Sequence, residues 1–339
     1  MRDDERSRLW IPGLALLLAV SAVLSLGFGS TGIGLREALR ALGDRSGTPA
    51  EVASVVTQIR LPRTLLAILI GGLLGISGAV MQGFFRNPMA EPYLVGVSSG
   101  AALGAVLAIL LGWEFRVGLF STVPLCAFVG AIGVTALVYA INRRRAGLQT
   151  GGLLLSGIAV ASAISAIVAL LMITSERSIQ QVLFWLLGSL AAARWEHLAV
   201  VAPYAAIGIM MTIVLARDLD ILLWGDVTSA ALGVHVERSR TLLLVAATLM
   251  AASAVAVAGV LGFVGLMVPH LARGWVGTGH RRLIPAAGLL GGLLLLWADV
   301  LARTLAAPTE LPLGAITAIV GAPFLVYLCT RGGRARWPF

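Results

Sequence analysis

The sequence predicts an all-α membrane protein, a polytopic bundle of ten transmembrane helices whose two termini both lie in the cytoplasm. Three observations support this fold class. Hydrophobic residues make up 58% of the 339-residue chain and charged residues only 12%, whereas soluble domains carry roughly 25% charged residues. Apolar runs recur along the chain, and a run of about 20 residues crosses the ~30 Å hydrocarbon core as a helix. The arginines are distributed unevenly between these runs.

The apolar runs define ten predicted spans. In chain order they lie at 9–28, 62–82, 94–112, 117–141, 152–173, 197–216, 241–261, 263–277, 283–302 and 312–330, and the boundary between the seventh and eighth is poorly marked. The connections are too short for a soluble domain, so residues 1–339 are expected to form one transmembrane domain. The strands of a membrane barrel would alternate apolar and polar residues, and these runs do not.

The arginines predict the orientation of the bundle. If the amino terminus is cytoplasmic, the two tails and the even-numbered connections are cytoplasmic too. These segments hold Arg2, Arg6, Arg8, Arg143, Arg144, Arg145, Arg238, Arg240, Arg281, Arg282, Arg331, Arg334 and Arg336. An excess of basic residues on the cytoplasmic side is usual in membrane proteins. The net charge of +9 is therefore attributed to topology, and nucleic acid is not an expected partner.

The first span is interpreted as a retained helix. It is too long for a secretory signal and lacks a small-residue cleavage site.

Residues that the chain lacks exclude several activities. It contains no lysine, so it cannot form the G-x-x-x-x-G-K-[ST] phosphate loop of an ATPase or a lysine Schiff base. The middles of the spans contain no Asp or Glu, which disfavours a carrier driven by ions or protons. Energy for transport is therefore expected from another subunit. Cys126, Cys329 and the four histidines show no metal-ligand spacing, and no nucleophile and base motif indicates an intramembrane enzyme.

One continuous segment, 60–101, has the features of a transport path. Two arginines open it, and an apolar stretch follows with Gly71, Gly75 and Ala79 at small-xxx-small spacing, which lets helices pack closely in lipid. A polar break at 86–92 interrupts it, and a second break is predicted at 262–270. Irregular backbone at membrane depth must be buried in protein or line a wet cavity. The first break is interpreted either as a simple turn or as part of a gate.

Three arginines at the predicted outer ends of spans are candidate docking residues. Arg60 and Arg63 share a helix face, and Pro62 between them suits a first helical turn. A cation at a helix amino terminus is unfavourable by about 0.3–1 kcal/mol, so the pair indicates an acidic partner. Snorkelling to the membrane interface is the alternative. Arg303 ends the ninth span four residues after Asp299, and an intrachain ion pair is its alternative role.

The longest polar inner connection lies at about 217–240. It is predicted to hold two short helices broken at Gly225 and Gly233, with Asp226 as the N-cap of the second. Five side chains are expected to form an apolar knob: Leu222, Leu223, Trp224, Ala231 and Leu232. An amphipathic segment resting on the membrane surface is the alternative interpretation.

The segment 60–101 resembles the signature of the permease subunits of type II ATP-binding-cassette (ABC) importers for iron chelates, haem and vitamin B12. Further family motifs follow in order: LLLSG at 153–157, FWLLGSL at 184–190, ALGV at 231–234, AGVLGFVGLMVPH at 258–270, ADVLAR at 298–303 and ELPLG at 310–314. Because the resemblance covers nearly the whole chain, the chain is identified as a member of this family. The resemblance implies ten transmembrane helices and a pair of permeases bound to two ATPase subunits.

The resemblance also implies roles for individual residues. Arginines matching Arg60, Arg63 and Arg303 receive acidic residues of the substrate-binding protein. The coupling helix that seats in the ATPase maps to Leu223, Trp224, Gly225, Asp226, Ala231, Leu232 and Gly233. The cytoplasmic gate maps to Asn87, Met89, Thr150 and Gly151; family members often have leucine at the Met89 position, and the loop before Thr150 diverges from the family.

The function expected on these grounds is import of an iron chelate, either ferric siderophore or haem, across the bacterial cytoplasmic membrane by alternating access. Vitamin B12 is the alternative cargo, and an ion-driven secondary transporter is the alternative class. The chain itself is expected to be non-catalytic and to hold no cofactor, with ATP and magnesium bound by the partner ATPase. Its other expected partners are a second copy or a close paralogue, an extracytoplasmic binding protein and membrane lipid.

Overall fold

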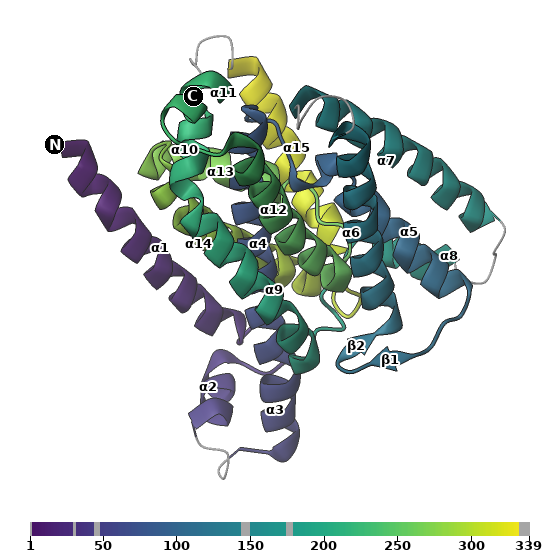
Figure 1. Ribbon diagram of the computed structural model, residues 1–339. Helices are drawn as coiled ribbons and strands as arrows, with labels where there is room; N and C mark the ends of the chain where they lie inside the picture. The colour runs from purple at the N-terminus through teal and green to yellow at the C-terminus, as the bar shows by residue number, and fades with distance from the viewer. Residues whose placement is uncertain (1, 30–31, 44–47, 144–149, 174–178, 332–339) are drawn as a thin grey trace.

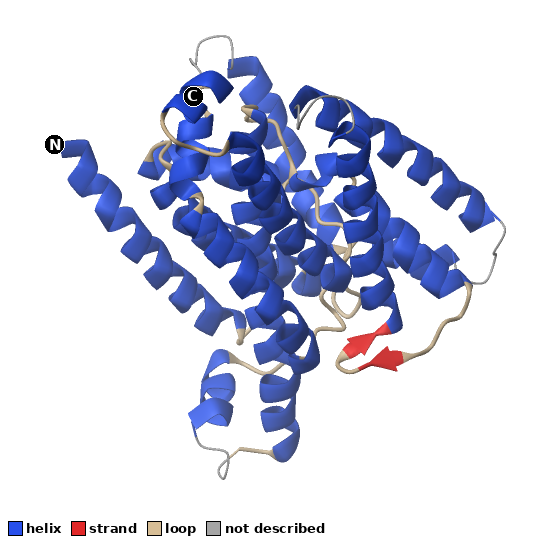
Figure 2. Cartoon of the chain, viewed as in Figure 1, coloured by secondary structure: helices blue, strands red, loops and turns tan. Residues whose placement is uncertain are grey.

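The computed structural model describes residues 2–29, 32–43, 48–143, 150–173 and 179–331 (Figure 1). The helices are α1 Arg2–Ser25, α2 Leu35–Gly43, α3 Ala50–Ser54, the π-helical turn η1 Val55–Arg60, α4 Leu61–Phe85, the 3₁₀ turn η2 Pro92–Val95, α5 Val97–Leu110, α6 Thr122–Arg143, α7 Thr150–Ile173, α8 Ile179–Leu186, α9 Trp195–Val214, α10 Ala216–Leu222, α11 Asp226–Ala231, α12 Val236–Ala258, α13 Val264–Val276, α14 His280–Thr304 and α15 Leu313–Arg331. A short antiparallel hairpin joins β1 (Arg116–Val117) to β2 (Phe120–Ser121) (Figure 2). The prediction of an all-α protein is confirmed apart from this hairpin.

Each of the ten predicted spans falls on one helix. Among the described residues, six helices are long and apolar enough to cross a membrane: the continuous helix Ala50–Phe85, α6, α7, α9, α12 and α14. The 14-residue α5 and the 13-residue α13 are shorter. They rise only about 20 Å at ~1.5 Å per residue, less than the thickness of the hydrocarbon core. Ten complete crossings therefore stay a prediction.

The two ends of the bundle hold different elements (Figure 1). α1 begins and α15 ends at the end that also holds α10 and α11, which we call the inner end. The hairpin and the pair α2 and α3 lie at the opposite, outer end. Both termini of the bundle therefore lie at one end, as an even number of crossings requires. The cytoplasmic location of this inner end stays a prediction. The sequence did not predict α2, α3 or α8.

Helix α4 lies at the centre of the bundle and packs along α14 through glycines. A Cβ on Gly71 would collide with the carbonyl oxygen of Gly291, and a Cβ on Gly291 would collide with that of Gly71. A Cβ on Gly75 would collide with the carbonyl oxygen of Ala287, and Ala79 is fully buried. The small-xxx-small spacing therefore brings two helix backbones into direct contact, as predicted.

A further glycine of α4 faces a carbonyl that a proline deprives of its regular helical partner. Pro269 lies within α13 and has no N–H, so it cannot bond the carbonyl of Gly265 four residues earlier. That carbonyl points at Gly78, where a Cβ would collide with it. The Cα–H group of glycine is a weak donor and is small enough to lie against this oxygen. Glycine at 78 thus accommodates proline at 269.

The entry into α4 differs from the prediction. The helix begins at Ala50 and runs without interruption to Phe85, 36 residues, passing through the π-helical turn η1 just before Pro62. Pro62 is therefore not in a first helical turn. A π-helical turn is a known response of a helix to a residue that cannot continue the regular hydrogen-bond pattern. Arg60 and Arg63 lie inside a helix and not at its amino terminus.

The two breaks in apolar sequence meet inside the bundle. The backbone N–H of Phe263 donates to Glu91 Oε1 at 2.9 Å, and the Tyr93 hydroxyl donates to the carbonyl of Leu261 at 3.0 Å. Both breaks are therefore buried against protein, which satisfies the irregular backbone. The second break is shorter than predicted, because residues 264–270 are helical and only 259–263 are irregular.

Candidate docking and coupling sites

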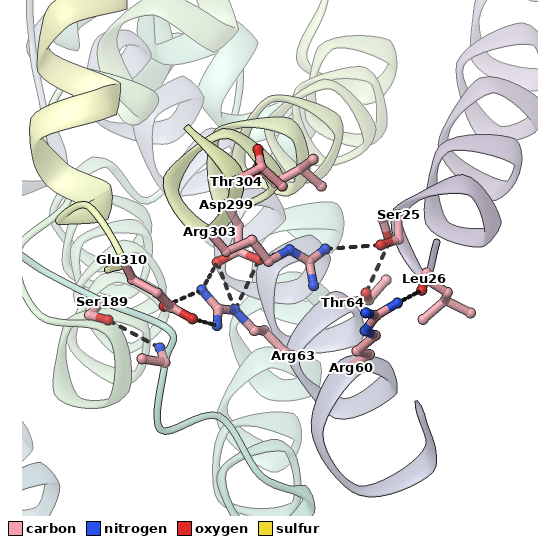
Figure 3. A network of polar contacts seen from close by, with 12 residues as sticks. Ser25, Leu26, Arg60, Arg63, Thr64, Ser189, Asp299, Arg303, Thr304 and Glu310 are labelled. Carbon is pink, nitrogen blue, oxygen red and sulfur yellow. Dashed lines mark hydrogen bonds and ion pairs between the residues drawn. The ribbon is translucent and has the colours of Figure 1, made fainter. Parts of the chain in front are cut away.

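At the outer end, Arg63 holds two carboxylates from distant parts of the chain (Figure 3). Its Nε and Nη2 donate to Asp299 at 2.9–3.1 Å. Its Nη1 and Nη2 donate to the two oxygens of Glu310 at 2.8 and 2.9 Å. Asp299 is fully buried on α14, whereas the side chain of Glu310, just before α15, is 35% exposed. This paired, forked geometry is the strong form of an arginine–carboxylate contact.

The other two outer arginines also have partners within the chain. Arg303 Nε lies 3.6 Å from Asp299 Oδ2, and its Nη2 donates to the carbonyl of Ser25 at 3.1 Å. Arg60 Nη1 donates to the carbonyls of Leu26 and Ile33. Arg60, Arg63 and Arg303 are each 5% exposed or less. The intrachain pair of Arg303 and Asp299 is confirmed, and snorkelling of Arg60 and Arg63 is wrong.

The argument that Arg60 and Arg63 are cations at a helix amino terminus is wrong. Arg60 reaches toward the end of α1, while Arg63 reaches toward α14 and Glu310 (Figure 3). The helix starts at Ala50, so its amino terminus lies well before Arg60 and does not disfavour the charge of either arginine. A docking role for the three arginines stays a prediction that rests on the family resemblance alone.

At the inner end, the predicted coupling loop folds as predicted into two short helices. α10 and α11 are separated at Gly225, and α11 is separated from α12 at Gly233. Gly225 and Gly233 have φ of +100° and +83°, which other residues rarely adopt, so both breaks require glycine. The hydroxyl of Ser229 donates to the carbonyl of Ile221 at 2.9 Å and ties the second helix to the first.

The apolar knob has a different composition from the predicted one. Trp224 is 77% exposed, Val227 86% and Leu232 57%, whereas Leu222 is only 3% exposed and packs inward. Leu223 is half-buried, and Ala231 and Gly233 are exposed. Val227 was missed because a lone valine after a charged residue gives no signal in the sequence. The large exposed apolar side chains of this loop all fall within residues 224–232, at the inner end.

The prediction that Asp226 is the N-cap of α11 is wrong. Gly225 holds that position, and Asp226 is the first residue of the helix. The carboxylate of Asp226 instead binds Arg240 of α12 at 2.6 and 2.9 Å and Arg86, at the end of α4, at 3.0 Å. Burial alone would raise the pKa of Asp226, but the hydrogen bonds and charges of Arg240 and Arg86 lower it. Asp226 is therefore ionised, and it joins three elements. Sequence reasoning counted Arg240 only toward the orientation of the bundle and assigned no role to Arg86.

The predicted gate residues lie on neighbouring elements. Asn87 Oδ1 accepts from the N–H of Met89 at 2.9 Å, which closes a tight turn after α4. Thr150 and Gly151 open α7, directly after residues 144–149, which lie outside the described part. α7 also contacts η2 of the same break, since a Cβ on Gly157 would collide with the carbonyl of Leu94. A gate formed by these residues stays a prediction.

Comparisons with known proteins agree with this architecture. The model of the FecCD transport family matches residues 17–331. The cobalamin import permease BtuC of Halobacterium salinarum is 45% identical over 83% of this chain and 75% of its own length. The hemin transport permease HmuU of Yersinia pestis is 39% identical over 94% and 95%. The Fe(3+)-citrate import permease YfmE of Bacillus subtilis is 37% identical over 96% of each chain.

Solved structures show the same likeness. The inward-facing structure of a putative metal-chelate type ABC transporter superposes with a TM-score of 0.83 at 34% identity, over 95% of this chain and 98% of that one. PsaBC from Streptococcus pneumoniae, solved with a Fab, shares the fold at a TM-score of 0.56 and 15% identity, over 81% and 93%. The chain therefore belongs to the FecCD transport family, whose members are multi-pass permease subunits of ABC importers.

Proposed function

We propose that this chain is the permease subunit of an ATP-driven importer that moves an iron chelate, a ferric siderophore or haem, across the bacterial cytoplasmic membrane by alternating access. The relatives named for hemin and ferric citrate, 39% and 37% identical, support this cargo. Cobalamin is the second candidate, because the 45% identical relative is named for it. All of these cargoes are bulky metal complexes, so one wide pathway suits each of them.

The exposed apolar surface of Trp224, Val227 and Leu232 is the observation that carries the ATP-driven mechanism. Grouped large apolar side chains on an exposed surface mark a site where another protein docks. This surface is formed by α11 and the residues at its two ends, within the segment that matches the family's coupling helix. We assign it to the ATPase, which would bind ATP and magnesium, since this chain has no lysine for a phosphate loop.

Assembly with the ATPase tests this assignment. Leu232→Glu places a charge in the proposed contact and should lower the amount of co-purified ATPase at least about tenfold, the loss expected at an interface hot spot. Leu119→Glu is the matched control, because Leu119 is 53% exposed on the outer hairpin. Equal recovery of the ATPase with both variants, or uptake by this chain alone driven by an ion gradient, would contradict the proposal.

The proposed docking of a binding protein requires an exchange of partners at Arg63. Glu310 is the partly exposed carboxylate of the pair, so an incoming acidic side chain would replace it while Asp299 stays in place. Arg60 and Arg303 would dock only after their contacts near the end of α1 open. Reversal of Arg63 to Glu is a poor test, because it would put three carboxylates together and unfold the outer end.

The proposed second copy would cover the exposed side of α7. Leu155, Leu170 and Ile173 on this helix are 71%, 65% and 77% exposed, and the same helix begins with the predicted gate residues Thr150 and Gly151. Two such helices facing each other would line a central pathway. A permease that runs as a monomer with its ATPase attached would contradict this arrangement.

The cargo is decided by uptake measurements on the complete importer. Radiolabelled cobalamin, ferric citrate and haemin are offered to cells with and without the chain and its binding protein. Uptake of an iron compound that depends on the chain supports the first candidate, and uptake of cobalamin alone supports the second. The binding protein is identified first, since in an importer of this class it selects the cargo.

A further inference from the structure

Arg86 links the coupling helices to the predicted gate, and nothing in the sequence or in the family match assigns it this role. It follows the last residue of α4 and directly precedes Asn87. Its backbone is left-handed, with φ 50° and ψ 38°, a conformation that is uncommon and strained for a residue with a side chain. Specific contacts must therefore hold it in place.

The backbone N–H of Arg86 bonds the last turn of α4, and its side chain bonds the coupling loop. The guanidinium of Arg86 donates through Nε and Nη2 to the carbonyl of Leu222, at 3.0 and 2.6 Å. Leu222 is the last residue of α10, where a helix leaves its carbonyls without helical partners. Nη2 also binds Asp226 at 3.0 Å, on the first residue of α11. Arg86 thus bridges the junction of the two coupling helices.

The same junction carries Trp224, the largest side chain of the proposed ATPase contact and 77% exposed. Trp224 lies between Leu222 and Asp226, the two residues that Arg86 binds. Arg240 holds the other oxygen of Asp226 at 2.9 Å, so the carboxylate is fixed to α12 as well. A partner that displaces Trp224 would also move the flanking Leu222 and Asp226, and both of these are hydrogen-bonded to Arg86.

On its other side, Arg86 is fixed to the turn that contains Asn87 and Met89. The N–H of Asn87 donates to the carbonyl of Gln82 at 3.0 Å, and the N–H of Ala90 donates to that of Asn87 at 3.0 Å. These short bonds make residues 86–90 a compact turn. Movement of the Arg86 backbone is therefore passed to Met89, three residues later.

We propose that Arg86 is a positioning residue that transmits movement of the α10–α11 junction to the turn 87–89. The inference rests on the proposed ATPase contact and deepens it. It assigns the transmission to one side chain, and it predicts that this side chain matters for the gate while the ATPase stays bound.

A thiol-accessibility experiment tests the inference without knowledge of the cargo. Met89→Cys is introduced into the full chain with Cys126 and Cys329 replaced by serine, and the permease is purified with its ATPase in nanodiscs. The rate of maleimide labelling at position 89 is measured with and without ATP. In this background ATP should change the rate. Adding Arg86→Gln should reduce the ATP-dependent change about tenfold, as expected for the loss of a charged hydrogen bond, while the bound ATPase continues to hydrolyse ATP.

Arg143→Gln is the matched control, since Arg143 pairs with Glu237 at 3.8 Å at the end of α6, with both side chains more than 60% exposed. It should leave the ATP-dependent change intact. An unchanged response in Arg86→Gln would overturn the inference. A background that binds no ATPase or shows no response to ATP would instead overturn the proposed function. If Arg86→Gln does not accumulate, Asp226→Asn is measured in its place, and a full response there would also overturn the inference.

Discussion

The outer and inner ends of this protein present opposite surfaces to their proposed partners. At the outer end, Arg60, Arg63 and Arg303 are each 5% exposed or less and bind groups of the same chain. At the inner end, Trp224 and Val227 are 77% and 86% exposed. The inner surface can bind a partner as it stands, whereas the outer arginines must first release their own ligands.

The difference has a simple physical origin. A buried charge is costly unless it is paired and hydrogen-bonded, so the outer arginines are stable only with Asp299, Glu310 and backbone carbonyls around them. An exposed apolar side chain costs less and gains free energy when a partner removes it from water. The outer end is therefore suited to exchange of ionic partners and the inner end to lasting contact.

The largest expected effect comes from removing the central outer cation. Arg63→Ala leaves the buried Asp299 with Arg303, at 3.6 Å, as its one cationic neighbour among the described residues, and should lower the free energy of unfolding by about 3–5 kcal/mol. Thermal unfolding in detergent measures this. Arg116→Ala removes an ion pair with Glu196 that is largely exposed, and should cost less than about 1 kcal/mol. Similar losses for the two variants would show that the outer end is not held together by its buried charges.

A smaller effect is expected between the two ends, where α4 meets α13. Gly78→Ala places a methyl group against the carbonyl of Gly265 and should destabilise the protein by about 1–3 kcal/mol. Gly133→Ala on α6 has no neighbouring atom within 4 Å and should be neutral or slightly stabilising. If the unfolding curves of the two variants coincide, the close contact of α4 with α13 does not stabilise the protein.

Glu310→Gln tests the exchange of partners directly. The amide loses the charge but keeps one hydrogen-bond acceptor, and partial exposure limits the loss of stability to about 1 kcal/mol. Because Arg63 then holds a weaker ligand, an acidic binding protein should bind several-fold more tightly, about fivefold for 1 kcal/mol. Surface plasmon resonance with the permease in nanodiscs measures this, with Glu196→Gln as the control. Weaker or unchanged binding would count against exchange at Arg63.

The smallest effect on stability is expected at the inner surface. Trp224→Ala should change the free energy of unfolding by less than about 0.5 kcal/mol, because its side chain already faces solvent. Leu222→Ala, two residues earlier and 3% exposed, should cost about 2–5 kcal/mol. If Trp224→Ala destabilised the chain as much as Leu222→Ala, the apolar surface would be part of the fold and not a docking site.

Local pattern predicted most of the fold. Hydropathy located a helix for each of the ten predicted spans, small residues at regular spacing predicted the contact of α4 with α14, and Gly225 and Gly233 marked the breaks around α11. Each of these features is determined by residues close together in the chain, so it can be recognised in the sequence alone. The breaks were also located, although the second was predicted to extend too far because Pro269 is tolerated inside α13.

The candidate sites were less predictable, because their contacts join residues far apart in the chain. Arg63 meets Asp299 across 236 positions, and Arg86 meets Asp226 across 140. Spacing along one helix could suggest the pair of Asp299 and Arg303 but not the partners of Arg63. The π-helical entry into α4 was missed for a similar reason, since apolar periodicity does not separate it from a regular helix start.

The contact of Gly71 with Gly291 has a consequence for motion during a transport cycle. Backbones in such direct contact cannot slide past each other without breaking many close contacts at once, so α4 and α14 form one rigid body. We therefore predict that rearrangement occurs outside that body, with the irregular segments 86–96 and 259–263 as its hinges. Two spin labels, one on each helix, would keep a constant separation while labels across either hinge change theirs.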